Sequence, residues 1–542
     1  MAHDPDSARL IDPETDPLAT YVLEPDDVRS LLDRVVTSPG GSTHTTHAPF
    51  TGAPIAAVPL STPEDVARAT TAARRAQRAW ARTPLRERAA VLLRVHDLVL
   101  AHQSDVLDLI QLENGKSRQS AYEEVADIAI IARHYAHRAS AYLAPRRVRG
   151  LLPVLTKVDV LRHPVGVVGI IAPWNYPLTL TLGDALPALV AGNAVVLRPD
   201  PQTALTALWA AEQLEAAGLP AGVLQVVVGD GSIGSAVIDH VDQVTFTGST
   251  ATGRVVAARA GERLIPATLE LGGKNPMYVA EDVDVEVAAE GAVRACFANT
   301  GQLCMSIERM YVHEAVADEF TEAFVRRTRA LRLGPGLDYA SDMGSLTSAQ
   351  QLARVVEHVE DALTHGARVL AGGVHRTDIG PLFYEPTILG DVPPQARAFR
   401  EETFGPVVAL YRVASDDEAV AAMNDTEFGL NASVWTRSTR RGAEIAARVG
   451  AGTVNVNEGY VAGWGSTGAP QGGRGQSGLG HRHGPEGIWQ TTEQQTVALQ
   501  RGVHSVLGGP GVGLHRLFDL GAERWTEVYT GLLRAMRTLR QP

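Results

Sequence analysis

The chain has 542 residues, which is too long for one compact core and predicts about three domain-sized units. Hydrophobic residues make up 45% and charged residues 20%, so the composition excludes a disordered or fibrous protein. The formal net charge of -12 disfavours nucleic acid and other polyanionic partners. The two cysteines, Cys296 and Cys304, exclude a disulfide framework and indicate a reducing compartment.

The N-terminal region is acidic and lacks the pattern of a signal peptide. Acidic side chains outnumber basic ones in the first thirty residues, the opposite of the basic start of such a peptide. The longest apolar run, residues 165–174, is far shorter than the roughly 20 residues that a membrane-spanning helix needs. We therefore expect a soluble, cytoplasmic protein in which residues 1–50 form an N-terminal arm.

A helical layer is expected first, and a parallel sheet follows it. Apolar residues recur at helical spacing between residues 62 and 144, and Pro63 suits a helix start. From residue 167 to 273, short β-branched runs alternate with stretches of helix length, which is typical of a doubly wound α/β domain that binds a nucleotide. The predicted strands are 167–171, 194–197, 224–228, 244–247 and 267–271, and the predicted helices are 178–191, 203–217 and 232–239.

A second α/β lobe is expected between residues 275 and 492. Its predicted elements are helices near 284–298 and 315–331 and strands near 407–411 and 453–456. Two lobes of this size leave a cleft between them, and clefts between domains are favoured ligand sites.

Two glycine-rich turns lie between predicted strands and helices. Gly229, Gly231 and Gly234 have the G-x-G-x-x-G spacing, but the acidic residue expected about twenty positions later to hold a ribose is missing. A plain tight turn explains this segment equally well. Gly248 and Ser249 begin a second turn, where the free amides of a helix start favour a phosphate, with a bare turn as the alternative.

Cys304 is the better candidate for a nucleophile. It lies in the polar segment Asn-Thr-Gly-Gln-Leu-Cys, whereas Cys296 lies in an apolar, helical context typical of a buried inert thiol. A cysteine nucleophile needs a base, and Glu270 ends an apolar strand, where loss of solvent raises its pKa toward useful base strength. A surface salt bridge between Glu270 and Lys274 is the alternative.

The segment Pro-Trp-Asn-Tyr-Pro at residues 173–177 follows a predicted strand. Its prolines restrict the loop, and the side-chain amide of Asn175 is suited to donate a hydrogen bond to a developing oxyanion. Taken alone, the segment is also consistent with a structural corner.

Together these segments resemble the aldehyde dehydrogenase superfamily from about residue 51 to about residue 496. Seven motifs occur in the family's order: Pro-Trp-Asn-Tyr-Pro (173–177), Gly-Asn-Ala-Val-Val-Leu-Arg-Pro (192–199), Phe-Thr-Gly-Ser (246–249), Leu-Glu-Leu-Gly-Gly-Lys (269–274), Gly-Gln-Leu-Cys (301–304), Glu-Thr-Phe-Gly-Pro (402–406) and Ser-Gly-Leu-Gly (477–480). The resemblance implies that Cys304 attacks the aldehyde and that Asn175 holds the oxyanion while a hydride passes to nicotinamide. It implies that Glu270 then activates water to hydrolyse the thioester, and that no metal is required.

The resemblance also implies NADP or NAD as the cofactor. It places these residues around it: Trp174, Asn175, Arg198, Pro199, Asp200, Pro201, Gly229, Gly231, Gly248, Ser249, Leu271, Glu402 and Phe404. The family's usual ribose pair, a lysine and a glutamate three residues later, is replaced here by Arg198 and Pro201. Loss of the glutamate favours NADP, whereas Asp200 is unfavourable near a 2′-phosphate, so we expect NAD(P) with a slight preference for NADP.

The family fold is α/β and divides the chain into interleaved parts. The expected parts are a Rossmann-like coenzyme-binding domain (51–145 and 164–272), an α/β catalytic domain (273–492), oligomerisation strands (146–163 and 493–500) and an amphipathic C-terminal tail (501–542). The oligomerisation strands extend one subunit's sheet onto its neighbour, so a homodimer or homotetramer is expected. The tail is expected to dock on protein, with contact to an anionic membrane as the alternative.

Further segments resemble an actinobacterial-type group of NADP-dependent succinate-semialdehyde dehydrogenases. They are 271–277, 342–346, 379–387, 430–435 and 482–487. Better-studied enzymes of that activity clamp the distal carboxylate with two arginines, but the matching residues here are Gly183 and Ala298. Ser466 matches a hydroxyl of the clamp, and Arg309 does not obviously replace the arginines. We expect succinate semialdehyde as the substrate, with a neutral aliphatic or aromatic aldehyde as the alternative.

Overall fold

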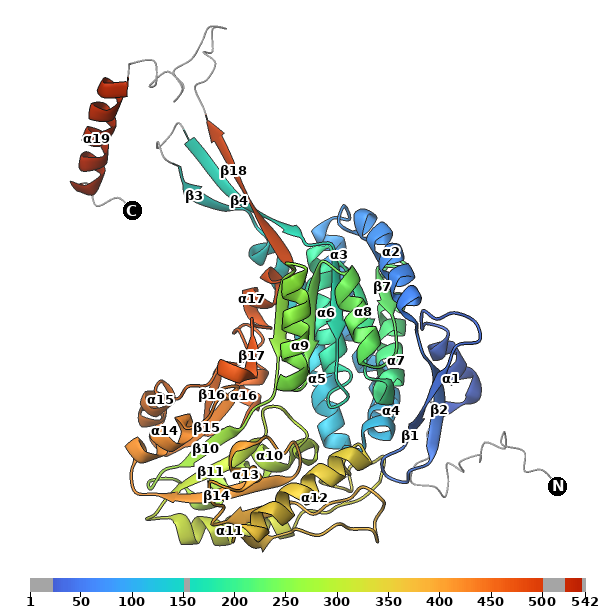
Figure 1. The fold of residues 1–542 in the computed structure, drawn as a ribbon, viewed down its shortest axis with the longest axis vertical. Helices are drawn as coiled ribbons and strands as arrows, with labels where there is room; N and C mark the ends of the chain where they lie inside the picture. The colour runs from blue at the N-terminus through green and yellow to red at the C-terminus, as the bar shows by residue number, and fades with distance from the viewer. Residues whose placement is uncertain (1–22, 151–155, 501–521, 539–542) are drawn as a thin grey trace, which may run out of the picture. The chain divides into compact units, whose positions relative to one another are not determined.

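The computed structural model of the chain describes residues 23–150, 156–500 and 522–538. Contacts divide the chain into two compact units, which are described separately, and Figure 1 labels the elements of both. The larger unit comprises Met1–Tyr142 with Pro164–Thr491, and the smaller comprises Leu143–His163 with Thr492–Pro542. All candidate catalytic residues belong to the larger unit.

The N-terminal elements among the described residues belong to the larger unit. They are α1 (Pro25–Leu32), β1 (Thr43–His47) and β2 (Pro54–Pro59), and β1 pairs antiparallel with β2. The backbone amide of Val36 donates to the carbonyl of Val226 at 2.8 Å, and Leu31, Val35 and Phe50 are buried. Residues 23–50 are therefore tied to the body of this unit.

Four helices form the expected helical layer. They are α2 (Pro63–Trp80), α3 (Leu85–Ala101), α4 (Gln103–Asn114) and α5 (Arg118–Tyr142). Pro63 occupies the first turn of α2, as predicted, and Thr62 and Asp65 cap that turn by reciprocal hydrogen bonds between side chain and backbone. Helix α5 buries Val125, Ile128 and other apolar residues where it packs against α3 and α6.

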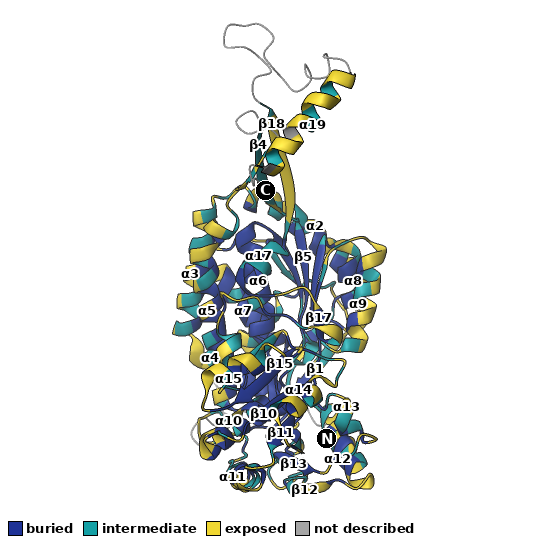
Figure 2. Cartoon of the chain, turned by 90° about the vertical axis from the view of Figure 1, so that its left-hand side faces the viewer, coloured by how far each residue is buried: buried dark blue, intermediate teal, exposed yellow. Residues whose placement is uncertain are grey.

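A six-stranded sheet has the order β17-β9-β8-β5-β6-β7. Its strands are β5 (Val167–Ile171), β6 (Ala194–Arg198), β7 (Leu224–Val226), β8 (Gln243–Thr247), β9 (Ala267–Glu270) and β17 (Gly478–Leu479). Strands β5 to β9 run parallel and are joined by α6 (Thr179–Ala191), α7 (Ala204–Ala216), α8 (Gly231–His240) and α9 (Thr250–Glu262). Strand β5 is fully buried between helices, as Figure 2 shows. The predicted doubly wound α/β sheet is confirmed, although the strand expected over 224–228 ends at Val226.

A seven-stranded sheet has the order β12-β13-β14-β11-β10-β15-β16. Its strands are β10 (Asn275–Val279), β11 (Ile307–His313), β12 (Arg368–Ala371), β13 (Thr387–Gly390), β14 (Val407–Val413), β15 (Asn431–Trp435) and β16 (Thr453–Val456). The associated helices are α10 (Val285–Phe297), α11 (Ala317–Arg329), α12 (Ala349–Thr364), α13 (Arg397–Arg400), α14 (Asp416–Asn424), α15 (Thr439–Ala446) and α16 (Val461–Trp464). Helix α17 (Gly484–Trp489) packs instead against α5 and α6. Beneath the sheet, Phe297 of α10 stacks on Phe324 of α11 with ring centres 6.0 Å apart.

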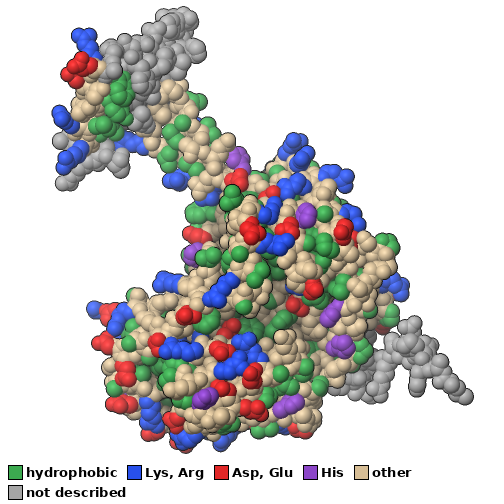
Figure 3. All heavy atoms as spheres, viewed as in Figure 1, with side chains coloured by type: hydrophobic (Ala, Val, Ile, Leu, Met, Phe, Trp, Pro, Cys, Tyr) green, Lys and Arg blue, Asp and Glu red, His purple; other side chains and the backbone are tan. Residues whose placement is uncertain are grey.

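Acidic and basic side chains are interspersed on the face of the molecule shown in Figure 3. Many of them form ion pairs, such as that of Arg441 with Asp416 at 2.6 Å. Within the ranges that the structure describes, no helix is both long and apolar enough to cross a bilayer.

The smaller unit contains a three-stranded sheet and a helix. Its elements are β3 (Arg146–Arg149), β4 (Thr156–Pro164), β18 (Thr492–Gln500) and α19 (Ala522–Thr538), with β4 between β18 and β3. In α19 the ring of Trp525 stacks on Tyr529, with centres 4.9 Å apart. The expected amphipathic tail spans residues 501–542, of which 501–521 and 539–542 lie outside the described residues.

Candidate active site

The carboxyl end of the six-stranded sheet gathers three of the predicted segments. Asn175 follows β5, Gly248 follows β8, and Glu270 ends β9. Strands β5 and β8 are adjacent, and the strand order reverses between them. Ligands of open parallel sheets bind at such a reversal, outside the carboxyl ends of the strands.

The loop that carries Cys304 has an unusual backbone. Asn299, Thr300 and Gly301 have φ values of +49°, +56° and +69°, although the branched side chain of Thr300 disfavours this left-handed region. A Cβ atom at residue 301 would collide with the carbonyl of Gly405, so only glycine fits there. The loop is therefore held in one conformation before it reaches Cys304.

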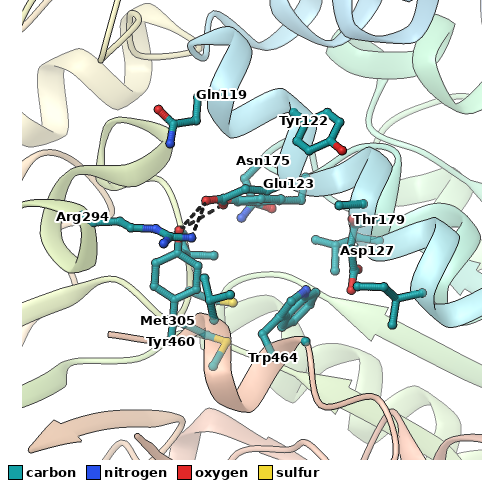
Figure 4. A pocket seen from close by; sticks show the side chains of 18 residues that line it. Gln119, Tyr122, Glu123, Asp127, Asn175, Thr179, Arg294, Met305, Tyr460 and Trp464 are labelled. Atoms are coloured by element: carbon teal, nitrogen blue, oxygen red, sulfur yellow. Dashed lines mark hydrogen bonds and ion pairs between the residues drawn. The ribbon is translucent and has the colours of Figure 1, made fainter. Parts of the chain in front are cut away.

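Two cavities meet at Cys304. The first has a volume of about 290 Å³ and the second about 190 Å³, and Asn175 and Cys304 line both. Glu270 lines the second cavity. Figure 4 shows the first cavity, whose lining includes Tyr122, Glu123, Asp127, Arg294, Tyr460 and Trp464. A group attached to Cys304 is thus accessible to a ligand from either side.

Burial controls the protonation of the two candidate catalytic residues. Burial raises the pKa of Glu270 to about 8, Arg482 opposes this rise, and the Oε1 atom of Glu270 has no hydrogen-bond partner. Burial likewise raises the pKa of Cys304 to about 12, again opposed by Arg482. The alternative salt bridge of Glu270 with Lys274 is wrong, because Lys274 pairs with Glu308 at 2.5 Å.

The two cysteines differ in their surroundings. Cys304 is partly exposed, whereas Cys296 is buried in the core of the seven-stranded sheet with 1% of its surface exposed. Burial raises the pKa of Cys296 well above its usual range, so this thiol stays protonated and out of reach of solvent.

Asn175 is held by three buried groups. Its Nδ2 atom donates to the carbonyl of Gln302 at 3.1 Å, which leaves the second N–H of the amide for a ligand. The backbone carbonyl of Asn175 accepts from the Nζ atom of Lys116 at 2.7 Å and from the Nδ2 atom of Asn299 at 3.0 Å. Lys116 in turn pairs with Glu124 at 2.7 Å. The segment after β5 is therefore anchored to α5 and to the cysteine loop.

The second cavity also contains part of the predicted cofactor set. Its lining includes Trp174, Gly248, Ser249, Leu271, Glu402 and Phe404. The Phe404 ring meets the Trp174 ring edge to face, with centres 5.6 Å apart, and Glu402 accepts from the amide of Gly273 at 2.8 Å. Ser249 lines the cavity and caps α9 by accepting from the amide of Thr252, so the N-terminus of α9 begins at the cavity wall.

The remaining predicted cofactor residues lie at neighbouring strand ends and not in this cavity. They are Arg198, Pro199, Asp200, Pro201, Gly229 and Gly231. Arg198 ends β6, and its Nη2 atom donates to the carbonyl of Gly229, which follows β7. Asp200 caps the next turn by accepting from the amide of Gln202 at 3.0 Å. The structure thus brings Arg198 and Gly229 together.

The four positions considered for a carboxylate clamp do not line the first cavity. They are Gly183, Ala298, Ser466 and Arg309. The Ser466 hydroxyl donates to the carbonyl of Ala462 at 2.7 Å. Arg309 is only 2% exposed and donates to the carbonyls of Lys274 and Met423. Ser466 and Arg309 therefore both have structural partners.

Two arginines at the site were missed by the sequence analysis. Arg294 lines the first cavity and pairs with Glu123 at 3.5 Å, while the hydroxyl of Tyr460 donates to both Glu123 oxygens at 3.0 Å. Arg482 is buried and pairs with Asp184 at 3.0 Å. Arg482 begins the segment 482–487, which the sequence marks only by its resemblance, and no sequence pattern distinguishes Arg294 from an ordinary helical arginine.

Known proteins resemble this chain over most of its length. The sequence pattern of the aldehyde dehydrogenase family matches residues 36–497. One relative is a protein of Mycolicibacterium smegmatis named "Putative succinate-semialdehyde dehydrogenase (NADP(+))". It is 50% identical to this chain over 491 residues. The match covers 90% of this chain and 93% of that protein.

Solved structures share the fold. The crystal structure of an E. coli NADP dependent enzyme is 35% identical, with a TM-score of 0.82 and coverage of 86% of this chain and 96% of that one. Betaine aldehyde dehydrogenase of Staphylococcus aureus in complex with NAD+ is 29% identical, with a TM-score of 0.82 and coverage of 89% and 98%. The expected family and fold are confirmed, and the chain belongs to the aldehyde dehydrogenase family of oxidoreductases.

Proposed function

We propose that this enzyme oxidises succinate semialdehyde to succinate with NADP, through a thioester on Cys304. The observation that carries the proposal is the position of Cys304, whose side chain lines both cavities. The name of the Mycolicibacterium relative supports the choice of substrate and cofactor.

Glu270 is the base for the attack of Cys304. The thiol is protonated at neutral pH, because its pKa is about 12, and it must lose this proton to become a nucleophile. Glu270 lines the same cavity, has one free carboxylate oxygen and has a pKa of about 8, so it is suited to accept the proton. The thiolate then attacks the aldehyde carbon, and the free N–H of Asn175 with the Cys304 amide stabilises the oxyanion.

Glu270 also serves the second half of the reaction. Bound NADP supplies the ring that accepts the hydride when the thioester forms on Cys304. Glu270 first releases to solvent the proton taken from Cys304, and it then removes a proton from water, so that the resulting hydroxide attacks the thioester carbon. The departing thiolate takes this proton from Glu270. The products are the carboxylic acid and the free thiol of Cys304.

The second cavity fits the nicotinamide end of a dinucleotide. Trp174, Leu271 and Phe404 provide flat apolar walls, and the first turn of α9 provides amides for a phosphate. We assign the adenosine end to the neighbouring strand ends, where Arg198 is the cation available to a 2′-phosphate and Asp200 opposes it.

Arg294 is the residue suited to the distal carboxylate of the substrate. Among the residues that line the first cavity, it is the one lysine or arginine. Its counter-ion, Glu123, has a pKa raised by burial, so Glu123 gives up its charge more readily than an exposed glutamate. A neutral aldehyde is the second candidate, because Leu180, Leu303 and other apolar side chains form much of the cavity wall.

Measuring kcat/KM for succinate semialdehyde, hexanal and benzaldehyde, each with NADP and with NAD, tests the proposal. We expect succinate semialdehyde with NADP to be preferred by about tenfold or more, the size of one charged contact. A preference for the neutral aldehydes would overturn the substrate, and a preference for NAD would overturn the cofactor.

We also propose a cytoplasmic homo-oligomer whose tail docks on protein. Free thiols at Cys296 and Cys304 suit a reducing compartment, and β18 exposes most of its residues, as a strand that pairs with a second subunit would. Light scattering should give the mass of a dimer or tetramer. Deleting residues 514–542 should leave co-sedimentation with anionic liposomes unchanged, and a loss of lipid binding would favour the membrane alternative.

A further inference from the structure

Arg482 and Asp184 form a buried ion pair near the candidate base, Glu270, and the proposed chemistry does not use this pair. The Nη2 atom of Arg482 donates to Asp184 at 3.0 Å and to the hydroxyl of Thr247 at 2.7 Å. The side chains of Arg482 and Asp184 are only 7% and 5% exposed. Burying two charges is costly, and replacing such a pair with apolar residues is often neutral or stabilising, so stability alone is a weak reason for its presence.

The sheet holds Arg482 close to Glu270. Thr247 of β8 and Gly478 of β17 are the register partners of Glu270 on the two sides of β9. Arg482 follows β17 closely, and its backbone exchanges two hydrogen bonds with Gln471, at 2.7 and 2.8 Å. The guanidinium therefore binds the residue that pairs with Glu270, while the Oε1 atom of Glu270 and the Nε atom of Arg482 have no hydrogen-bond partner.

The charges around this pair oppose one another. After burial, which raises the pKa of Glu270 and of Cys304, the next largest influence on each is Arg482, which lowers it. Asp184 raises the pKa of Glu270. Burial lowers the pKa of Arg482, but its anionic neighbours, Asp184 and Glu270 foremost, together raise the pKa above its usual value, so the arginine stays charged. The other charged groups that face these residues are Asp127 for Arg482 and Glu402 for Cys304.

We propose that Arg482 is a positioning residue that sets the proton balance between Cys304 and Glu270, and that Asp184 limits its effect. A cation at this place stabilises both anions that the reaction needs, the thiolate and the carboxylate. The neighbouring carboxylate of Asp184 prevents Arg482 from keeping Glu270 permanently ionised and weakly basic. This inference rests on the proposed function, because it takes Cys304 as the nucleophile and Glu270 as the base.

The pH dependence of kcat in Arg482→Gln and Asp184→Asn tests the proposal, because the two substitutions act with opposite signs. Arg482→Gln removes the cation, so the midpoint of the rise in kcat with pH should move up by about one pH unit. Asp184→Asn removes the anion but keeps the shape, so the midpoint should move down. Arg482→Lys keeps the charge and should restore a midpoint near that of the wild type.

The matched control is Arg88→Gln, which removes another buried arginine. Arg88 lies on α3, is 8% exposed and donates to the carbonyl of Ala81 at 3.0 Å. This variant should lose thermal stability and keep the wild-type midpoint. Thermal melting of every variant shows which of them remain folded, and Asp184→Asn gives the answer if Arg482→Gln does not fold.

Alkylation of Cys304 by iodoacetamide gives a readout that needs neither aldehyde nor cofactor. At a fixed pH, Arg482→Gln should slow alkylation of Cys304 by about tenfold, because fewer molecules carry the thiolate. Buried Cys296, located in the same digest by mass spectrometry, is the internal reference.

Midpoints that stay at the wild-type value, or that move in the same direction in the folded Arg482→Gln and Asp184→Asn variants, would overturn the inference. An unchanged rate of Cys304 alkylation in folded Arg482→Gln would do the same. Turnover by Glu270→Gln distinguishes failure of this inference from failure of the proposed function. If Glu270→Gln turns over at the wild-type rate, Glu270 is not the base and the proposed function fails. If Glu270→Gln is inactive but the midpoints of Arg482→Gln and Asp184→Asn stay at the wild-type value, only the role of the ion pair is rejected.

Discussion

The two cavities that meet at Cys304 are formed by different kinds of secondary-structure element. The second cavity is lined mainly by short segments that directly follow β5, β8 and β9, together with Cys304 and residues of α12 and of the segment after α13. The first cavity is lined largely by residues of α5, α6, α10 and α16, of which α5 supplies the most and α10 supplies Arg294 alone.

Because of this difference, different parts of the molecule determine the chemical reaction and the choice of aldehyde. The sheet fixes the position of the segments that follow its strands, so the backbone of the second cavity keeps its place as long as the fold is kept. A wall of helix side chains changes with single substitutions that leave the helices intact. The chemistry at Cys304 therefore follows from the family fold, whereas the substrate depends on residues such as Arg294 and Glu123.

The largest effect is expected at Cys304, which with Asn175 lines both cavities. Cys304→Ala removes the nucleophile and should lower aldehyde oxidation by about 10⁴-fold or more, measured as the rate of reduced nicotinamide formation. Cys296→Ala is the matched control and should retain activity with a small loss of thermal stability, because it only leaves a small hole in the core. Equal loss in both variants would contradict the assignment.

The next largest effect is expected on the side of the second cavity. Glu270→Gln should lower steady-state turnover by about 10²- to 10⁴-fold, because no base remains to activate water. In the wild type, turnover should rise as the pH passes about 8, since the carboxylate is the active form and forms above its pKa. Stopped-flow and steady-state assays over a pH series check both points, and a similar rise in Glu270→Gln would show that another group is titrating.

A smaller and selective effect is expected in the first cavity. Arg294→Gln should raise KM for succinate semialdehyde by about tenfold, because the distal carboxylate loses its cation, and should leave hexanal oxidation nearly unchanged. Glu123→Gln, which removes the counter-ion and keeps the acceptor for Tyr460, should lower KM for succinate semialdehyde. Equal changes for both aldehydes would indicate that Arg294 only shapes the cavity.

The smallest effect is on stability, at the loop that joins the two cavities. Gly301→Ala should lower the free energy of unfolding by about 2 kcal/mol or more, because the new methyl group meets the Gly405 carbonyl in a left-handed backbone. Gly366→Ala is the control, since its φ is +98° but the space around it is open, so it should cost only the backbone strain. Urea titration compares the two, and equal losses would mean that the close approach is unimportant.

The sequence predicts the second cavity better than the first, and the reason is physical. Asn175, Gly248 and Glu270 lie in compact motifs, because a strand end places several consecutive residues at one edge of the sheet. Arg294 lies ten residues before Cys304 in an ordinary helical pattern, and only the packing of α10 turns it into the cavity. Sequence spacing within a helix does not specify which neighbouring element it faces.

The sequence also does not predict which charged residues pair with one another. Lys274 lies four residues from Glu270 in the chain, yet its ammonium pairs with Glu308 of β11. Arg482 is more than two hundred residues away and pairs with Asp184 of α6 beside the base. Such pairs form between segments that only the folded sheets bring together, so proximity in the chain is a poor guide to them.

The most direct measurement is mass spectrometry of Glu270→Gln after it is mixed with succinate semialdehyde and NADP at about pH 10, where part of Cys304 ionises without a base. Hydrolysis still lacks its base, so the acyl group should accumulate on the enzyme. The account predicts a succinyl thioester on the peptide that contains Cys304 and none on the peptide that contains Cys296. An unmodified Cys304, or an acyl group on another residue, would contradict it.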